Sequence, residues 1–245
     1  MLKTDNTQFS NDFYQTTELW GGYKITPAFQ LLAFIPFNTN ISVSDDSKKT
    51  NSGFGDVTLL ANYKVFKNNS WLRDTLSVRQ QLWLGGGIKM PTGKFSIDTS
   101  EVVSSANSQP GTGSIDFIVM GSYDLLIENW GITSNLSYKI NQSTLDYKFG
   151  NRFNAGLFAF RSFYLKQITF SPNLGLLYEN LNPNKMSGKK VENTGGNDLL
   201  GVIGIETRLD RIIIGLNTQF PLMNNISDNQ TNIKVRAMAH ITYVF

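Results

Sequence analysis

The sequence lacks cysteine altogether and contains a single histidine, His240, among its 245 residues. Without cysteine there is no disulfide framework, no thiolate metal site and no cysteine nucleophile. The absence also fits an oxidising compartment, where an unpaired thiol is a liability. No cluster of histidine and carboxylate residues has metal-ligand spacing. We therefore expect neither a metal nor any other cofactor.

Long hydrophobic runs are missing as well. The longest uninterrupted stretches, such as Leu199–Ile205, have about seven residues, whereas a membrane-spanning helix needs roughly 18. This excludes a helical membrane protein. Charged residues make up only 17% of the chain, against about 25% in a typical soluble domain. The aromatic content of 12% argues against disorder. The net charge of +3 comes without a basic cluster, so nucleic acid is not an expected partner.

The dominant pattern in the sequence is period-2 alternation, which is typical of β-strands. In the clearest case, 233–245, apolar residues alternate with a more polar set that includes Arg236 and His240. Helical periodicity hardly appears. We predict eleven strands, at 12–26, 28–43, 56–66, 75–89, 114–127, 130–141, 147–162, 166–181, 196–210, 211–223 and 233–245.

The strand and loop lengths favour a transmembrane barrel over a soluble sandwich. Soluble strands average about five or six residues, whereas strands that cross a membrane need about 9–11, and most of these run longer. Such barrels also alternate short periplasmic turns with longer extracellular loops. Tight connections are expected at 26–28, 127–130, 162–166 and 210–211, and long ones at 43–53, 91–112, 181–196 and 223–232. Only 67–73 and 143–147 blur the pattern. We predict an all-β, antiparallel, up-and-down transmembrane β-barrel.

Eleven strands is an unusual count, because single-chain bacterial barrels have even numbers and both termini in the periplasm. Counting back from Phe245, residues 1–11 would form an extracellular loop or a disordered start. No signal peptide is visible after Met1. We therefore predict a single barrel domain over 1–245 that has about 12 strands when intact. Its first strand and signal peptide would lie upstream of Met1, and strand 12–26 would lack its usual neighbour.

Three short motifs carry a resemblance to a known family. Gly53–Asp56 has the sequence Gly-Phe-Gly-Asp, Lys89–Gly93 has Lys-Met-Pro-Thr-Gly, and Gly111–Asp116 has Gly-Thr-Gly-Ser-Ile-Asp. In this combination, over about residues 19–127, the chain resembles the outer-membrane family named for the meta-pathway of phenol degradation. The resemblance implies a barrel that transports aromatic or other hydrophobic compounds. It carries over no catalytic or binding residue.

The C-terminus resembles the targeting signal of outer-membrane barrels, in which a terminal phenylalanine follows apolar or aromatic residues at alternate positions. The residues concerned are Ile241, Tyr243 and Phe245. We therefore expect a multi-pass protein of the bacterial outer membrane. Its expected partners are the lipid bilayer with lipopolysaccharide, the barrel assembly machinery, a small-molecule solute and other outer-membrane proteins.

The inner register of the strands supplies the candidate solute path. We predict that the lumen is lined by Arg79, Trp83, Lys89, Asp116, Arg152, Phe158, Glu206, Arg208, Arg236 and His240. This wall fits a channel or transporter for small, hydrophobic or aromatic solutes. Its mixed charges fit equally a salt-bridged plug in a structural or adhesion barrel whose function lies in the extracellular loops. A lone histidine on this register indicates a wall residue rather than a catalytic base, so we expect no enzyme.

Overall fold

The computed structural model describes residues 11–44, 47–72, 75–96, 109–227 and 234–245. Over these ranges the chain is built from β-strands and contains no α-helix. No helix in this part of the chain is long and apolar enough to cross a membrane.

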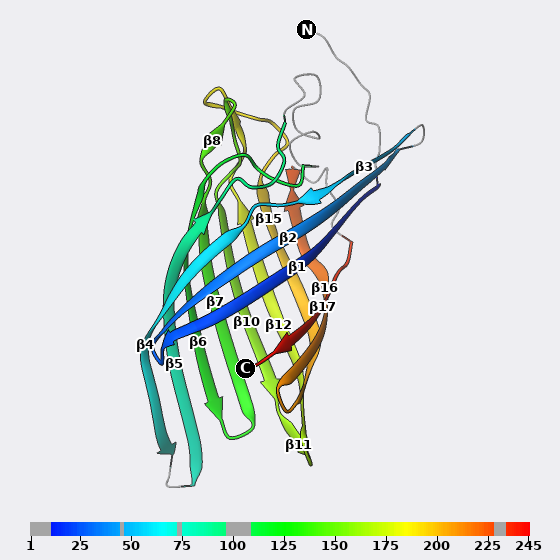
Figure 1. Cartoon of the computed structure of the whole chain (residues 1–245). Helices are drawn as coiled ribbons and strands as arrows, with labels where there is room; N and C mark the ends of the chain where they lie inside the picture. The colour runs from blue at the N-terminus through cyan, green and yellow to red at the C-terminus, as the bar shows by residue number, and fades with distance from the viewer. Residues whose placement is uncertain (1–10, 45–46, 73–74, 97–108, 228–233) are drawn as a thin grey trace.

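One antiparallel sheet forms the body of the molecule and curls into a half-barrel (Figure 1). In the described ranges, eleven strands follow one another along it in chain order: β1 (Asn11–Thr26), β2 (Phe29–Ser44), β4 (Thr58–Leu72), β5 (Leu76–Lys89), β6 (Asp116–Ile127), β7 (Trp130–Ile140), β10 (Arg152–Arg161), β12 (Ile168–Leu181), β15 (Gly196–Leu209), β16 (Ile212–Ile226) and β17 (Arg236–Tyr243). Two shorter strands, β3 (Ser47–Phe54) and β11 (Phe163–Leu165), pair with β2 and β12. The predicted fold class and the predicted eleven strands are confirmed.

The two kinds of connection lie at opposite ends of the half-barrel (Figure 1). Short turns join β1 to β2, β6 to β7 and β15 to β16 at one end, here called the turn end. The longer connections lie at the other end, the loop end. Two of them contribute a separate small sheet, made of β8 (Ser143–Thr144), β9 (Tyr147–Lys148), β13 (Lys185–Met186) and β14 (Lys189–Lys190).

Some predicted boundaries are wrong, and each error has a local cause. The supposed turn at 67–73 is largely strand, because β4 continues to Leu72 after a register shift between Lys64 and Phe66. Such a bulge reverses the alternation that follows it. Residues 147–151 do not belong to the barrel strand, since 147 and 148 pair in the small sheet instead. The expected loop 43–53 contains β3. Most of the predicted start, 1–11, and residue 233 lie outside the described residues.

The sheet is open between its first and last strands. Among the described strands, β1 pairs only with β2, and β17 pairs only with β16. In the described part of the chain, the strand predicted at 12–26 thus has one neighbouring strand. The upstream strand and signal peptide stay predictions.

Apolar and polar residues are distributed inside out compared with a soluble protein. The outer face of the sheet exposes large apolar side chains, including Leu19 (72%), Ile203 (61%) and Ile241 (74%). Apart from glycines and Pro110, the buried residues of the described chain are mostly polar: Asp56, Asn62, Lys89, Ser114, Asp116, Asn141 and Asp198, beside Tyr147, Leu200 and Val202. An apolar exterior around a polar interior is the arrangement of a barrel surrounded by lipid.

Aromatic residues mark both ends of the outer face. Strand pairing places all of the following on that face, near the turn end: Tyr23, Tyr63, Tyr123, Trp130 and Tyr243. A second group lies toward the loop end: Phe37, Tyr138, Tyr178 and Phe220. Two such belts are expected where amphipathic rings meet two membrane–water interfaces.

Candidate functional site

The motif residues of the sequence meet in a buried ion cluster at the loop end of β4, β5 and β6. This motif cluster consists of Asp56, Lys89, Thr112 and Asp116. The Lys89 Nζ lies 2.7 Å from Asp56 Oδ2 and 2.7 Å from Asp116 Oδ2. Strand register explains half of the arrangement, because Lys89 and Asp116 are directly opposite on β5 and β6. Lys89 and Asp116 therefore form a closed ion pair rather than an open stretch of the predicted solute path.

The aspartates of the motif cluster are held by hydrogen bonds as well as by charge. Asp56 accepts from the Thr112 backbone N–H at 2.8 Å, from the Thr112 hydroxyl at 2.8 Å and from the Gly93 N–H at 3.0 Å. Lys89 also donates to the Thr112 hydroxyl. Asp116 accepts from the Ser114 hydroxyl at 2.8 Å and from the Gln142 N–H at 3.0 Å. Buried charges are stable only when paired and hydrogen-bonded in this way.

Two glycines let the chain cross itself beside the motif cluster. A Cβ added to Gly111 would lie 2.6 Å from the Gly93 carbonyl carbon, and one added to Gly93 would lie 2.7 Å from the Gly111 Cα. Both distances are shorter than real Cβ contacts allow. Thr92 completes the junction, because its hydroxyl accepts from the Val57 N–H at 2.9 Å and donates to the Gly55 carbonyl at 3.1 Å. The motifs thus tie the segment after β5 to the start of β4.

A second ion cluster lies across the wall at the same end. Arg236 on β17 donates to Glu179 on β12 at 3.0 Å and to Asp198 on β15 at 3.2 Å. The Asp198 side chain is fully buried, and its Oδ1 has no hydrogen-bond partner. Because β16 lies between β15 and β17, the Arg236 guanidinium reaches across β16 on the inner face. This Arg236 cluster joins β17 to two strands, β12 and β15, with which β17 does not pair.

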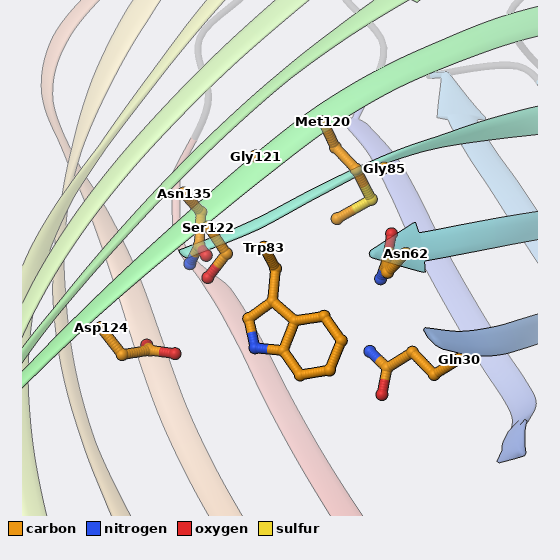
Figure 2. Close-up of a pocket in the computed structure, with 9 residues that line it drawn as sticks. All are labelled: Gln30, Asn62, Trp83, Gly85, Met120, Gly121, Ser122, Asp124 and Asn135. Carbon is orange, nitrogen blue, oxygen red and sulfur yellow. The ribbon is translucent and has the colours of Figure 1, made fainter. Parts of the chain in front are cut away.

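A hollow lies on the inner wall midway along the strands (Figure 2). It has a volume of about 280 Å³ and is lined by Gln30, Asn62, Trp83, Gly85, Met120, Gly121, Ser122, Asp124 and Asn135. We call it the Trp83 hollow. Trp83 projects from β5 into it, with Gln30 and Asn62 on one side and Asp124 on the other (Figure 2). Register places Trp83, Ser122 and Asn135 in one row across β5, β6 and β7.

The Trp83 hollow offers a ring face and a few polar groups. The Lys64 Nζ lies 4.7 Å from the centroid of the Trp83 ring. Asn62 is 6% exposed, and its Oδ1 has no hydrogen-bond partner. A Cβ on Gly85 would lie 1.9 Å from this oxygen, so the glycine makes the space that the amide occupies. Asp124, by contrast, accepts from Gln81 and Thr133, both at 2.8 Å. The hollow can hold a small planar molecule against the Trp83 ring, whereas the Asn62 Oδ1 is buried behind the wall.

The remaining predicted lumen residues lie apart from these sites. The Phe158 ring packs on Gly175, where an added Cβ would lie 2.3 Å from Phe158 Cδ1. The His240 Nε2 lies 3.9 Å from Glu206 Oε2, and its ring packs on Gly215. Arg79 and Arg208 are exposed and lie toward the turn end. Arg152 is also exposed but lies near the loop end, opposite Lys139. The ten predicted residues therefore do not form one site.

Sequence reasoning missed several residues that the structure makes central. Asp56 and Thr112 belong to the motifs, but the motifs were used only for the resemblance. Glu179 and Asp198 occupy the inner register opposite each other on β12 and β15, and alternation could have identified them. Neither Asn62 nor Gly85 alone predicts that the two lie side by side, because their contact depends on the pairing of β4 with β5.

A family model described as "Putative MetA-pathway of phenol degradation" matches residues 4–203. The chain belongs to this family. The match is longer than the 19–127 of the resemblance and takes in the motif cluster, the Trp83 hollow and the strands up to β15. No curated protein matches the chain. The family and the all-β fold point to a non-enzymatic barrel protein. In the described ranges, no group of three or more histidine, cysteine or carboxylate residues could hold a metal ion.

Proposed function

We propose that this protein is a channel or transporter of the bacterial outer membrane for small, hydrophobic or aromatic solutes. The observation that carries the proposal is the Trp83 hollow, which places an aromatic face among polar side chains halfway along the inner wall. Aromatic solutes can stack against such a ring, and Lys64 above it adds a cation. The family description, which names phenol degradation, supports an aromatic solute.

The outer face supports placement in the outer membrane. It carries exposed apolar side chains with an aromatic belt at each end, as lipid-embedded barrels do. Ile241 and Tyr243 are exposed on this face, and the Phe245 ring packs edge-on against Tyr243 with 5.0 Å between centroids. This arrangement suits a C-terminal targeting signal. The bilayer with lipopolysaccharide and the assembly machinery are the corresponding proposed partners.

The test uses Trp83 as its own reporter. The chain has four tryptophans, so replacing Trp20, Trp71 and Trp130 by Phe leaves Trp83 as the only one. Nitrobenzene should quench this fluorescence saturably in the refolded protein. In proteoliposomes, the wild-type protein should raise uptake of nitrobenzene-sized neutral aromatics, and Trp83→Leu should lower it several-fold. Trp130→Leu, on the outer face, is the matched control. Uptake that is equal with and without the protein would refute the proposal.

A structural or adhesion barrel is the second candidate, and the loop end supports it. Tyr147 is fully buried there and accepts from the Asn184 Nδ2 at 2.7 Å. Its ring packs edge-on against Phe149, which in turn packs on Phe95. Burial raises the pKa of the Tyr147 phenol. Three connections are thus locked into an ordered surface, as a docking barrel requires. Planar-bilayer recordings without any conductance would favour this candidate.

A further inference from the structure

Two cations face each other on the inner wall between the motif cluster and the Arg236 cluster. Lys139 on β7 is directly opposite Arg152 on β10. Both occupy the inner register, which they share with Asn135 in the Trp83 hollow. The Cβ atoms of such opposite residues are about 5 Å apart, and like charges in this relation are destabilising. The sheet therefore places two positive charges together at a position where pairing alone would disfavour them.

Neither cation has an ion-pair partner on the wall, although Asp116 and Asp56 lie near enough to Lys139, and Asp198 near enough to Arg152, to attract them at longer range. Within the described part of the chain, no ion pair or side-chain hydrogen bond is formed by Lys139 or Arg152. The nearest inner-wall carboxylates form their ion pairs elsewhere, those of Asp56 and Asp116 with Lys89 and those of Glu179 and Asp198 with Arg236. The Arg152 side chain is exposed, and that of Lys139 is partly buried. The pair thus offers a solute from the loop end an accessible guanidinium with an ammonium group beside it.

We propose that Lys139 and Arg152 form a binding site for an organic carboxylate. The inference rests on the proposed function and narrows it, because it makes the preferred solute a small aromatic anion. A guanidinium binds a carboxylate through two parallel N–H···O bonds, and an ammonium adds a compact point charge. Rings of arginine and lysine serve the same purpose in anion-selective pores.

The distance to the Trp83 hollow defines an order of events. Asn135 shares a row with Trp83, and Lys139 is four residues further along β7. At about 3.3 Å per residue, the two levels are roughly 13 Å apart. A single-ring carboxylate is too short to reach both. It would be captured by its charge at Lys139 and Arg152, and its ring would then move to Trp83.

The test compares benzoate with benzyl alcohol, which has a ring of the same size and no charge. Equilibrium dialysis against the full chain folded in detergent micelles measures binding without requiring transport. Wild-type protein should bind benzoate with an affinity that falls as salt rises. In Lys139→Gln/Arg152→Gln, benzoate should bind about tenfold more weakly or worse, through loss of charge-assisted hydrogen bonds. Benzyl alcohol binding should not change.

Arg208→Gln is the matched control, because it removes an exposed inner-wall arginine near the turn end. An equal loss of benzoate binding in this variant would overturn the site, because it would show that the overall positive charge of the inner wall attracts benzoate. Unchanged benzoate binding in the double variant would overturn it too. Heat-modifiability on gels shows whether the double variant is folded. If it is not, Arg152→Gln alone, which changes an exposed position, replaces it in the test. It should show at least a threefold loss.

The same proteins in liposomes separate this inference from the proposed function. If benzoate binds in micelles and loses affinity in the double variant, but the wild-type protein raises the uptake of neither benzoate nor benzyl alcohol into proteoliposomes, transport is refuted and the site stands. Uptake of both solutes that is insensitive to the double variant would leave transport standing and refute the site.

Discussion

Replacing Lys89 by methionine should be the most damaging single change in the motif cluster. The side chain is 9% exposed and contacts two aspartates whose side chains are 4% and 0% exposed. Methionine keeps most of the volume but removes the only cation that forms an ion pair with either carboxylate in the described residues. Breaking a buried pair by removing one partner costs about 3–5 kcal/mol, because an uncompensated charge stays buried.

The hydrogen bonds of the two aspartates narrow the expected loss of stability. After the change, Asp56 keeps three hydrogen-bond donors and Asp116 keeps two, which offsets part of the lost attraction. We therefore expect a loss near the lower limit, about 3 kcal/mol in the free energy of unfolding, or more than 100-fold in the folded-to-unfolded ratio. The assay is urea unfolding in lipid vesicles, followed by tryptophan fluorescence.

A second variant makes the reasoning refutable. Asp56→Asn/Lys89→Met/Asp116→Asn removes all three charges, and neutral replacements of whole buried ion clusters are often tolerated. It should be more stable than Lys89→Met alone, although it carries two further substitutions. Lys64→Met is the control, because it removes a cation that has no carboxylate partner but contacts the Trp83 ring and donates to the Pro27 carbonyl at 2.9 Å, and it should cost about 1–2 kcal/mol. A triple variant less stable than Lys89→Met, or a Lys89→Met variant within 0.5 kcal/mol of wild type, would refute the account.

Three further changes test other parts of the molecule. Gly175→Val should cost about 1–3 kcal/mol by overpacking against Phe158, whereas Gly21→Val, where an added Cβ meets nothing within 4 Å, should be nearly neutral in the same unfolding assay. Tyr147→Phe should cost about 1 kcal/mol through loss of the Asn184 hydrogen bond, and faster proteolysis confined to the loop end would report it. Deleting Phe245 should lower the amount of assembled protein in outer-membrane fractions without changing the unfolding of what assembles, and normal amounts would contradict the targeting role.

Most of the fold follows from alternation, because a barrel strand has one apolar and one polar face along its whole length. The errors come where that rule is interrupted. At Lys64–Phe66 one extra residue shifts the register, so Phe66 and Tyr123 come together on the outer face although the simple period predicts otherwise. Such a bulge depends on pairing with β5, and a single strand does not reveal it. The small loop-end sheet is equally hidden, since its strands have two residues each.

The sequence predicts which face of the sheet the site residues occupy, but not which residues they contact. Alternation correctly places Lys89, Asp116 and Arg236 on the inner register. It says nothing of which carboxylate each cation meets, because Arg236 reaches across β16 to Glu179 and Asp198. The sequence therefore left open whether these charges line a path or pair with one another, and the structure has two closed clusters and one open pair.

The division between closed and open charges also bears on what family membership implies. The glycines, threonines and aspartates of the motifs are consumed in tying the segment after β5 to β4, with Lys89 closing the cluster. Asp56 and Asp116 are buried and paired with Lys89, so neither carboxylate is open to a solute. The groups that remain available, the Trp83 ring and the Lys139–Arg152 pair, lie outside the motifs. A match that depends on the motifs thus identifies how the loop end is anchored, and different members could share it while binding different solutes. Solute preference in this protein should accordingly respond to changes at Trp83, Lys139 and Arg152, and stability to changes at Asp56, Lys89 and Asp116.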